Sequence, residues 1–179
     1  RARRGHLLSE LCEIPRTFNL PVVMGFTERA RHEAATLKHA PKATKEQLLM
    51  LCHADAFIKA ALGIEAWMMR VAPKETAMII AEDAPKMKKM IKAMHAGYAD
   101  RFSALGENDK VFHSNHIVET VHFAEKAESM PLQVADACAF VMKRHLMEKN
   151  DVDGYFDVLR NEIVWYDDEV GGLMHIEAA

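Results

Sequence analysis

The sequence predicts an α/β domain in which the sheet is largely covered on both faces. Residues 21–26 and 76–81 form two short, almost entirely apolar runs, which are typical of strands without a solvent-exposed face. A third strand is predicted over residues 116–123. Segments with helical spacing of apolar residues separate these strands, and strands that alternate with helices favour an α/β or α+β fold.

The segments around the first strand are predicted from helix and loop signals. Residues 5–18 form the first predicted helix, which ends at Asn19-Leu20-Pro21. Residues 29–43 are rich in Lys, His, Ala and Pro and are predicted to be an exposed loop. Thr44 and Gln47 have the spacing of a capping box, which predicts a long apolar helix that reaches Val71.

Three more helices are predicted after the second strand. One follows Ala84-Pro85 and has an apolar stripe along its length. Another opens with Pro131 in its first turn, and the last covers residues 155–165. The first stripe consists of Met87, Met90, Ile91, Met94, Tyr98 and Phe102, and the apolar face after Pro131 consists of Leu132, Ala135, Ala139 and Met142.

The composition favours one soluble domain. Half of the 179 residues are hydrophobic and 27% are charged, and no apolar run approaches the roughly 20 residues that a membrane span needs. The net charge of -3 argues against a generally basic coat for nucleic acid but allows a local patch. Cys12, Cys52 and Cys138 lie far apart among apolar neighbours, which predicts reduced, buried thiols in a cytoplasmic protein. The oligomeric state is not indicated.

Asp136 is a carboxylate inside a run that otherwise has the pattern of a buried helix. Leu132 and Phe140 lie one turn before and after it, so we expect little water around it. An ionised group in such a place must be paired or bound to a metal, or it takes up a proton. The alternative is an Asp at the rim of the helix interface, hydrogen-bonded to a neighbouring loop.

Glu82 and Asp83 lie where the second predicted strand ends, which is where open α/β sheets place their ligands. Asp83 has an alternative role, because an Asp before Ala84-Pro85 can cap the following helix. Glu82 and Asp136 come from different elements and could meet at one edge of the sheet. Together they could hold Mg²⁺ or Mn²⁺, since hard cations prefer oxygen ligands.

Other polar groups are less specific. Asp55 and Glu65 could complete such a site, but Asp55 lies four residues before Lys59, which favours a surface ion pair. His113, His116 and His122 are interpreted as surface or core histidines rather than zinc ligands. The lysines after Asp83 form either a solvated helix face or a set of phosphate contacts. They are Lys86, Lys88, Lys89 and Lys92.

Two motifs resemble those of a known family. Leu132-Gln133-Val134-Ala135-Asp136 follows a strand and a short loop, and Ala81-Glu82-Asp83 closes an earlier strand. From Leu7 to about Arg160 the chain resembles the uncharacterised bacterial and phage family called domain of unknown function three-thousand-eight-hundred. That family is assigned to the ribonuclease-H-like superfamily, whose members bind divalent metals with carboxylates from a first strand, a later strand and a C-terminal helix.

The resemblance implies a ribonuclease-H-like mixed sheet flanked by helices and a site for Mg²⁺ or Mn²⁺. By matching position, Asp136 would be the helix carboxylate and Glu82, or as second choice Asp83, the strand carboxylate. The family pattern also opens with a strand that carries Asp-x-Ser-Gly, and nothing of that form occurs before Pro21. We expect the leading strands to precede this numbering, because a sheet without its opening hairpin would expose strand edges.

We therefore expect residues 1–179 to form one ribonuclease-H-like domain that is incomplete at its N-terminus and not competent for catalysis alone. The first hypothesis is a metal-dependent nuclease or phosphodiesterase that acts on nucleic acid, with Glu82 and Asp136 as ligands. Gln133 would orient the site, and Lys86 and Lys89 would meet phosphate. The second hypothesis is a non-catalytic ribonuclease-H-like scaffold or binding module, in which Asp136 is held by structural hydrogen bonds.

Overall fold

The computed structural model describes residues 2–85, 87–92, 116–118, 121–167 and 172–175. It divides the chain into two compact units, which we call the terminal unit (residues 1–24 and 124–179) and the middle unit (residues 25–123). A single domain over residues 1–179 stays a prediction.

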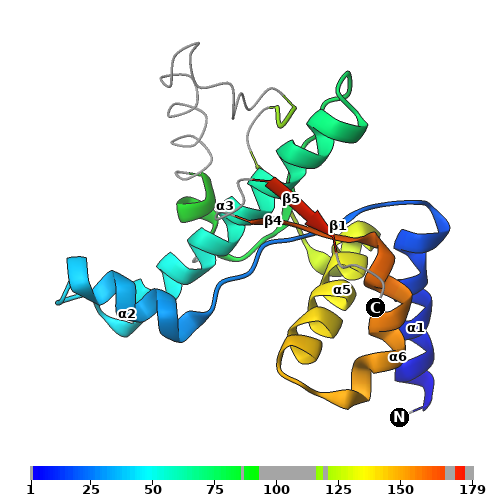
Figure 1. The fold of residues 1–179 in the computed structure, drawn as a ribbon, viewed down its shortest axis with the longest axis horizontal. Helices are drawn as coiled ribbons and strands as arrows, with labels where there is room; N and C mark the ends of the chain where they lie inside the picture. The colour runs from blue at the N-terminus through cyan, green and yellow to red at the C-terminus, as the bar shows by residue number, and fades with distance from the viewer. Residues whose placement is uncertain (1, 86, 93–115, 119–120, 168–171, 176–179) are drawn as a thin grey trace. The chain divides into compact units, whose positions relative to one another are not determined.

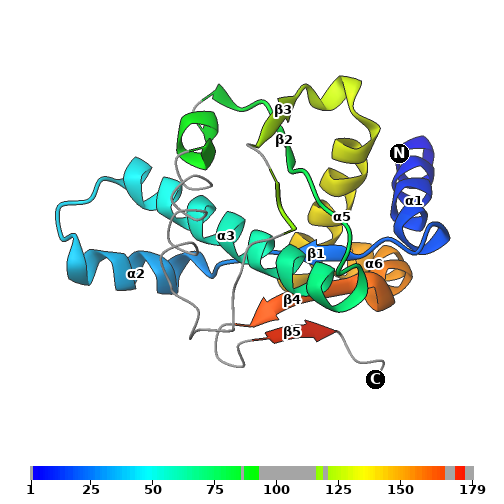
Figure 2. The ribbon, with the colours of Figure 1, turned by 90° about the horizontal axis from the view of Figure 1, so that it is seen from above.

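The terminal unit combines helices with a small mixed sheet (Figures 1 and 2). In this sheet β4 lies between β1, to which it is parallel, and β5, to which it is antiparallel. Val23 is opposite Val164, and Trp165 is opposite Met174. The elements are α1 (Ala2–Thr17), β1 (Val22–Met24), the 3₁₀ turn η1 (Lys126–Glu128), α5 (Met130–Leu146), η2 (Asn150–Val152), α6 (Asp153–Leu159), η3 (Arg160–Glu162), β4 (Ile163–Asp167) and β5 (Gly172–His175).

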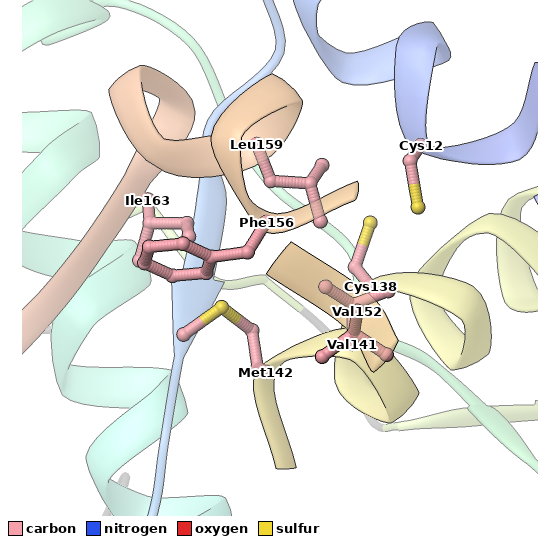
Figure 3. Close-up of a cluster of buried hydrophobic side chains, with 8 residues drawn as sticks. All are labelled: Cys12, Cys138, Val141, Met142, Val152, Phe156, Leu159 and Ile163. Atoms are coloured by element: carbon pink, nitrogen blue, oxygen red, sulfur yellow. The ribbon is translucent and has the colours of Figure 1, made fainter. Parts of the chain in front are cut away.

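The core of the terminal unit lies where α5 packs against α1 and α6 (Figure 3). Figure 3 shows the Cys12 and Cys138 thiols pointing toward each other across this core. All three cysteines of the chain are buried and free, as the sequence predicts. The buried cluster consists of Cys12, Cys138, Val141, Met142, Val152, Phe156, Leu159 and Ile163.

The middle unit is built on the long helix α3 (Lys45–Val71), along which α2 (Arg29–His39) packs (Figure 1). The predicted capping box is confirmed, since the Gln47 N–H donates to the Thr44 hydroxyl and the Thr44 N–H donates to the Gln47 side chain. Two short strands, β2 (Ile80–Glu82) and β3 (His122–Ala124), form a two-stranded parallel sheet. Residues 85 and 87–92 are helical, as predicted.

The prediction of an exposed loop over residues 29–43 is wrong for most of that stretch, because Arg29–His39 is the helix α2. None of its residues, all of which the structure describes, is buried. A helix of this kind has no apolar stripe to reveal it, and its Ala, Arg, Leu and Lys residues favour the helix through intrinsic propensity. An ion pair of 2.6 Å between Arg29 and Glu33, four residues apart, adds to it.

The prediction of one helix over residues 155–165 is correct only in its first half. Helix α6 ends at Leu159, and Ile163–Asp167 is the strand β4. The run Ile-Val-Trp-Tyr is rich in the β-branched and aromatic residues that strands prefer. The prediction failed because a short apolar run fits a helix and a strand equally well by periodicity. Strand β5 was also not predicted.

Two predictions of burial are wrong. Residues 76–81 were predicted to be a buried strand, but β2 begins only at Ile80, and the side chains of Met78 and Ile80 are exposed. Ala135 and Ala139 were predicted on the buried face of α5, but both are exposed. The buried face of α5 consists instead of Ala137, Cys138, Val141 and Met142.

Helix α3 is long enough and apolar enough to cross a membrane by those two criteria alone. The core helix of a soluble protein passes the same test, and 28% of the apolar stretch of α3 is buried within the structure. The cytoplasmic location and the absence of a membrane partner therefore stay predictions.

Replacing Gly25 with Ala is expected to destabilise the middle unit. An added Cβ would overlap the Ala56 carbonyl oxygen and lie 2.6 Å from the Ala60 nitrogen, both backbone atoms of α3 that cannot rotate away. Overpacking of this kind costs about 1–3 kcal/mol or more. Urea unfolding should show the loss. Gly154→Ala is the control, because an added Cβ there meets no described atom within 4 Å, and Ala favours a helix by about 0.5–1 kcal/mol.

Burial of two thiols predicts a loss of stability at alkaline pH. Burial raises the pKa of Cys12 from 9.0 to about 11 and that of Cys138 from 9.0 to about 12. The folded state thus holds these protons more tightly, and the resulting stabilisation is complete below about pH 9 and is lost as pH rises toward these values. Between the unfolded and the folded pKa, each thiol lowers the free energy of unfolding by up to about 1.4 kcal/mol per pH unit.

Urea unfolding in reductant at about pH 7, 9 and 10.5 measures this slope. The Cys138→Ala variant should lose stability less steeply than the wild type above about pH 9, although it starts from a lower value. Equal slopes in the two proteins would contradict the assignment.

Candidate functional site

The strand-end carboxylates lie in the middle unit, on the surface. Strand β2 ends at Glu82, whose side chain is exposed, and Asp83 follows it. Both carboxylate oxygens of Asp83 accept hydrogen bonds from Lys88 Nζ, at 3.1 and 3.2 Å. Asp83 thus has a cationic partner from the helix that it precedes, while Glu82 presents its carboxylate to solvent.

The lysines beside these carboxylates differ in their surroundings. Lys88 Nζ lies 5.0 Å from the centre of the Phe123 ring, and Lys92 Nζ lies 5.8 Å from it, so both take part in cation–π contacts with β3. Lys89 is exposed, and Lys86 lies outside the described residues. Of the two lysines predicted to meet phosphate, Lys89 is therefore placed at the surface.

Asp136 lies on α5 in the terminal unit, and its side chain is 57% exposed. The expectation of scarce water around Asp136 is wrong, because α5 buries the face that carries Cys138 and Val141 instead. The requirement for a partner is met by Lys126, whose Nζ lies 2.6 Å from Asp136 Oδ2. This geometry agrees with the alternative of an Asp at the rim, bound to a neighbouring turn.

Gln133 fixes the turn that carries this lysine. Its Nε2 donates to the backbone carbonyls of Lys126 and Ala127, at 3.3 Å each. The first turn of α5 thereby holds η1, and η1 presents Lys126 to Asp136. Lys126 was not predicted as a site residue, since ten residues separate it from Asp136 and no helical or strand spacing connects them. In the sequence, the one feature that points to this contact is the short loop before the predicted helix start at Pro131.

The predicted site residues thus form two groups. Glu82, Asp83 and Lys89 lie in the middle unit, and Gln133 and Asp136 lie in the terminal unit. A shared cation site made by Glu82 and Asp136 stays a prediction. Within the described ranges, no group of three or more His, Cys, Asp and Glu side chains could hold a metal ion. Glu82 and Asp136 are exposed oxygen donors, the ligand type that Mg²⁺ and Mn²⁺ prefer, and Asp136 is paired with Lys126.

The acidic residues of α3 have structural partners. Asp55 Oδ2 lies 3.1 Å from Lys59 Nζ, so the predicted ion pair is confirmed, and the Thr27 hydroxyl also donates to Asp55. Glu65 is only 1% exposed. One of its oxygens accepts the Ile117 N–H at 2.8 Å, and the other lies 3.0 Å from His116 Nδ1.

The Glu65 contacts explain one of the clustered histidines. His116 is a buried core residue, in agreement with its interpretation as structural. His122 is exposed, and His113 lies outside the described residues. Because Ile117 forms a bridge with Ala77, Glu65 connects α3 to the chain segments that lead into β2 and β3.

Comparison of the chain with protein-family models, curated proteins and solved structures gives no match.

Glu65→Leu is expected to destabilise the middle unit by about 2–5 kcal/mol, because the Ile117 N–H and the His116 ring lose a buried acceptor. Glu65→Gln should cost less, since its amide oxygen can still accept one hydrogen bond. Urea unfolding monitored by circular dichroism measures both. Wild-type stability in Glu65→Leu would show that these contacts contribute nothing.

Proposed function

We propose that this protein is a ribonuclease-H-like, divalent-metal-dependent phosphodiesterase that acts on nucleic acid. The observation that carries the proposal is the exposure of the Glu82 and Asp136 carboxylates, one in each of the two motifs that resemble the family. An exposed carboxylate is accessible to a cation, whereas a buried and fully bonded one, such as Glu65, is not. The mixed α/β composition is compatible with this fold class.

In this proposal Glu82 and Asp136 hold Mg²⁺ or Mn²⁺, with Asp83 as the second choice at the strand end. When bound, the ions supply the Lewis acidity that activates water and stabilises the leaving oxygen of a phosphodiester. Gln133 orients the site by holding η1 through two backbone carbonyls. Lys89, with Lys86, supplies positive charge for the phosphate backbone next to the strand-end carboxylates.

A specific observation favours the second hypothesis, a non-catalytic scaffold or binding module of the same class. Asp136 is already paired with Lys126 at 2.6 Å, as expected for a carboxylate in a structural role. Such a scaffold would use the lysines of the middle unit to bind nucleic acid without cleaving it. The enzyme would need the Asp136 carboxylate for cleavage, whereas the scaffold would bind nucleic acid without it.

The test is Mn²⁺-dependent cleavage of single- and double-stranded DNA and RNA by the full-length protein. Asp136→Asn and Glu82→Gln should each reduce the rate at least about 100-fold, since even residues that only support metal ligands are worth about 10- to 100-fold. Glu75→Gln is the matched control for Glu82, because Glu75 is also an exposed acid of the middle unit. It should retain wild-type activity.

Two results would change the conclusion. Equal activity in the wild type and Asp136→Asn would remove the proposed enzyme mechanism. Binding of nucleic acid without cleavage, unchanged in Asp136→Asn, would favour the scaffold.

A further inference from the structure

Cys52 on α3 lies against a basic side chain of the neighbouring helix α2. Its Sγ is 3.4 Å from His32 Nδ1, which is within hydrogen-bond range for sulfur. Cys12 and Cys138 lie instead in the buried apolar cluster of the terminal unit. The chain thus holds one thiol beside an imidazole and two thiols packed among apolar side chains.

Cys52 lies under a helix that is itself at the surface. It is 8% exposed, and α2, which packs along α3, has no buried residue over the whole of Arg29–His39. His32 itself is half-buried. An element with so few buried contacts opens locally at low free-energy cost, so a small reagent can reach the Cys52 sulfur.

The surroundings of the Cys52 thiol favour its protonated form. Burial raises the pKa of the Cys52 thiol, and the Glu33 carboxylate adds to this rise. Arg29 opposes the rise in this pKa, and Asp55 adds a smaller increase. Because the thiolate is the nucleophilic form of cysteine, a thiol of this kind reacts slowly unless a base accepts its proton during the reaction.

His32 is placed to be that base. In the tautomer whose proton is on Nε2, the lone pair of Nδ1 is free to accept the thiol proton. The Thr36 hydroxyl lies 3.5 Å from the same nitrogen. A hydroxyl both donates and accepts, so Thr36 can hydrogen-bond to the ring before and after the proton arrives.

We propose that Cys52 and His32 form a nucleophilic thiol site that takes low-molecular-weight disulfides. The Cys52 sulfur attacks one sulfur of the reagent while its proton passes to His32 Nδ1. The new S–S bond forms as that of the reagent breaks, and the released thiolate takes the proton from the imidazolium. One mixed disulfide and one free thiol result, with no net oxidation.

A disulfide suits this site because its leaving group returns the proton, so that His32 ends the reaction as it began it. The site consists of residues from α2 and α3 of the middle unit alone. It is therefore independent of the proposed nuclease function and of any metal ion.

The first test needs no variant. The full-length protein reacts at neutral pH with limiting hydroxyethyl disulfide, a neutral probe, and mass spectrometry follows each cysteine in the native and the urea-unfolded chain. Burial and local opening can only slow a thiol relative to the unfolded chain, whereas a positioned base accelerates it. Native Cys52 should react at least about twofold faster than unfolded Cys52. Native Cys12 and Cys138 should react more slowly than in the unfolded chain.

A native rate for Cys52 equal to or below its unfolded rate would overturn the proposal. The thiol would then be a passively buried one, as Cys12 and Cys138 are.

The second test is His32→Gln, which removes the base and keeps a good helix former. It should slow the native reaction of Cys52 at least about 10-fold, because a positioned general base contributes about 100-fold or more. His39→Gln is the matched control, since His39 is an exposed histidine in the last turn of the same helix. It should react as the wild type does.

The direction of the change separates a base from a cover. If His32 only shields the sulfur, His32→Gln leaves the rate of Cys52 equal or makes it faster, and with helical content unchanged by circular dichroism this result would show the proposal to be wrong. If His32→Gln loses its helical content, the comparison of native and unfolded wild type decides alone.

Discussion

The packing of α5 against α1 and α6 is the constraint on which the terminal unit and its part of the candidate site depend. Cys138 and Val141 face Cys12, Phe156 and Leu159 in one buried cluster (Figure 3). Successive residues of a helix are rotated by about 100°, so a residue two positions before Cys138 points about 200° away from it. The buried core thereby directs Asp136 to the surface.

The same rotation explains why Gln133 and Asp136 act on one turn of the chain. They are three residues apart and share a face of α5, where Gln133 binds the backbone of η1 and Asp136 pairs with the lysine of η1. A carboxylate placed this way is neutralised yet accessible. The structure shows this carboxylate in an ion pair with Lys126, and a cation site at Asp136 stays a proposal.

In the middle unit an acidic residue is buried, in contrast to the exposed Asp136. Glu65 is buried on α3, and its two carboxylate oxygens contact the His116 ring and the Ile117 N–H. Both oxygens therefore hold the segment around Ile117 and are not available to a ligand. Glu82 stands exposed at the end of β2. The sequence favours Glu82 over Glu65 as a site residue, because Glu82 lies at a predicted strand end, and burial separates the two in the structure. The partner that distinguishes Glu65 lies more than fifty residues away in the chain.

Local signals in the sequence were sufficient for features decided within one or two turns. These include the capping box of α3, the first turn of α5, which contains Pro131, and the ion pair between Asp55 and Lys59. Such features depend on neighbours three or four residues apart. The tertiary structure alone decided which side of α5 is buried, that Ile163–Asp167 is a strand, and that Lys126 meets Asp136. Each of these depends on contacts between distant parts of the chain, and helical or strand periodicity carries no information about such contacts.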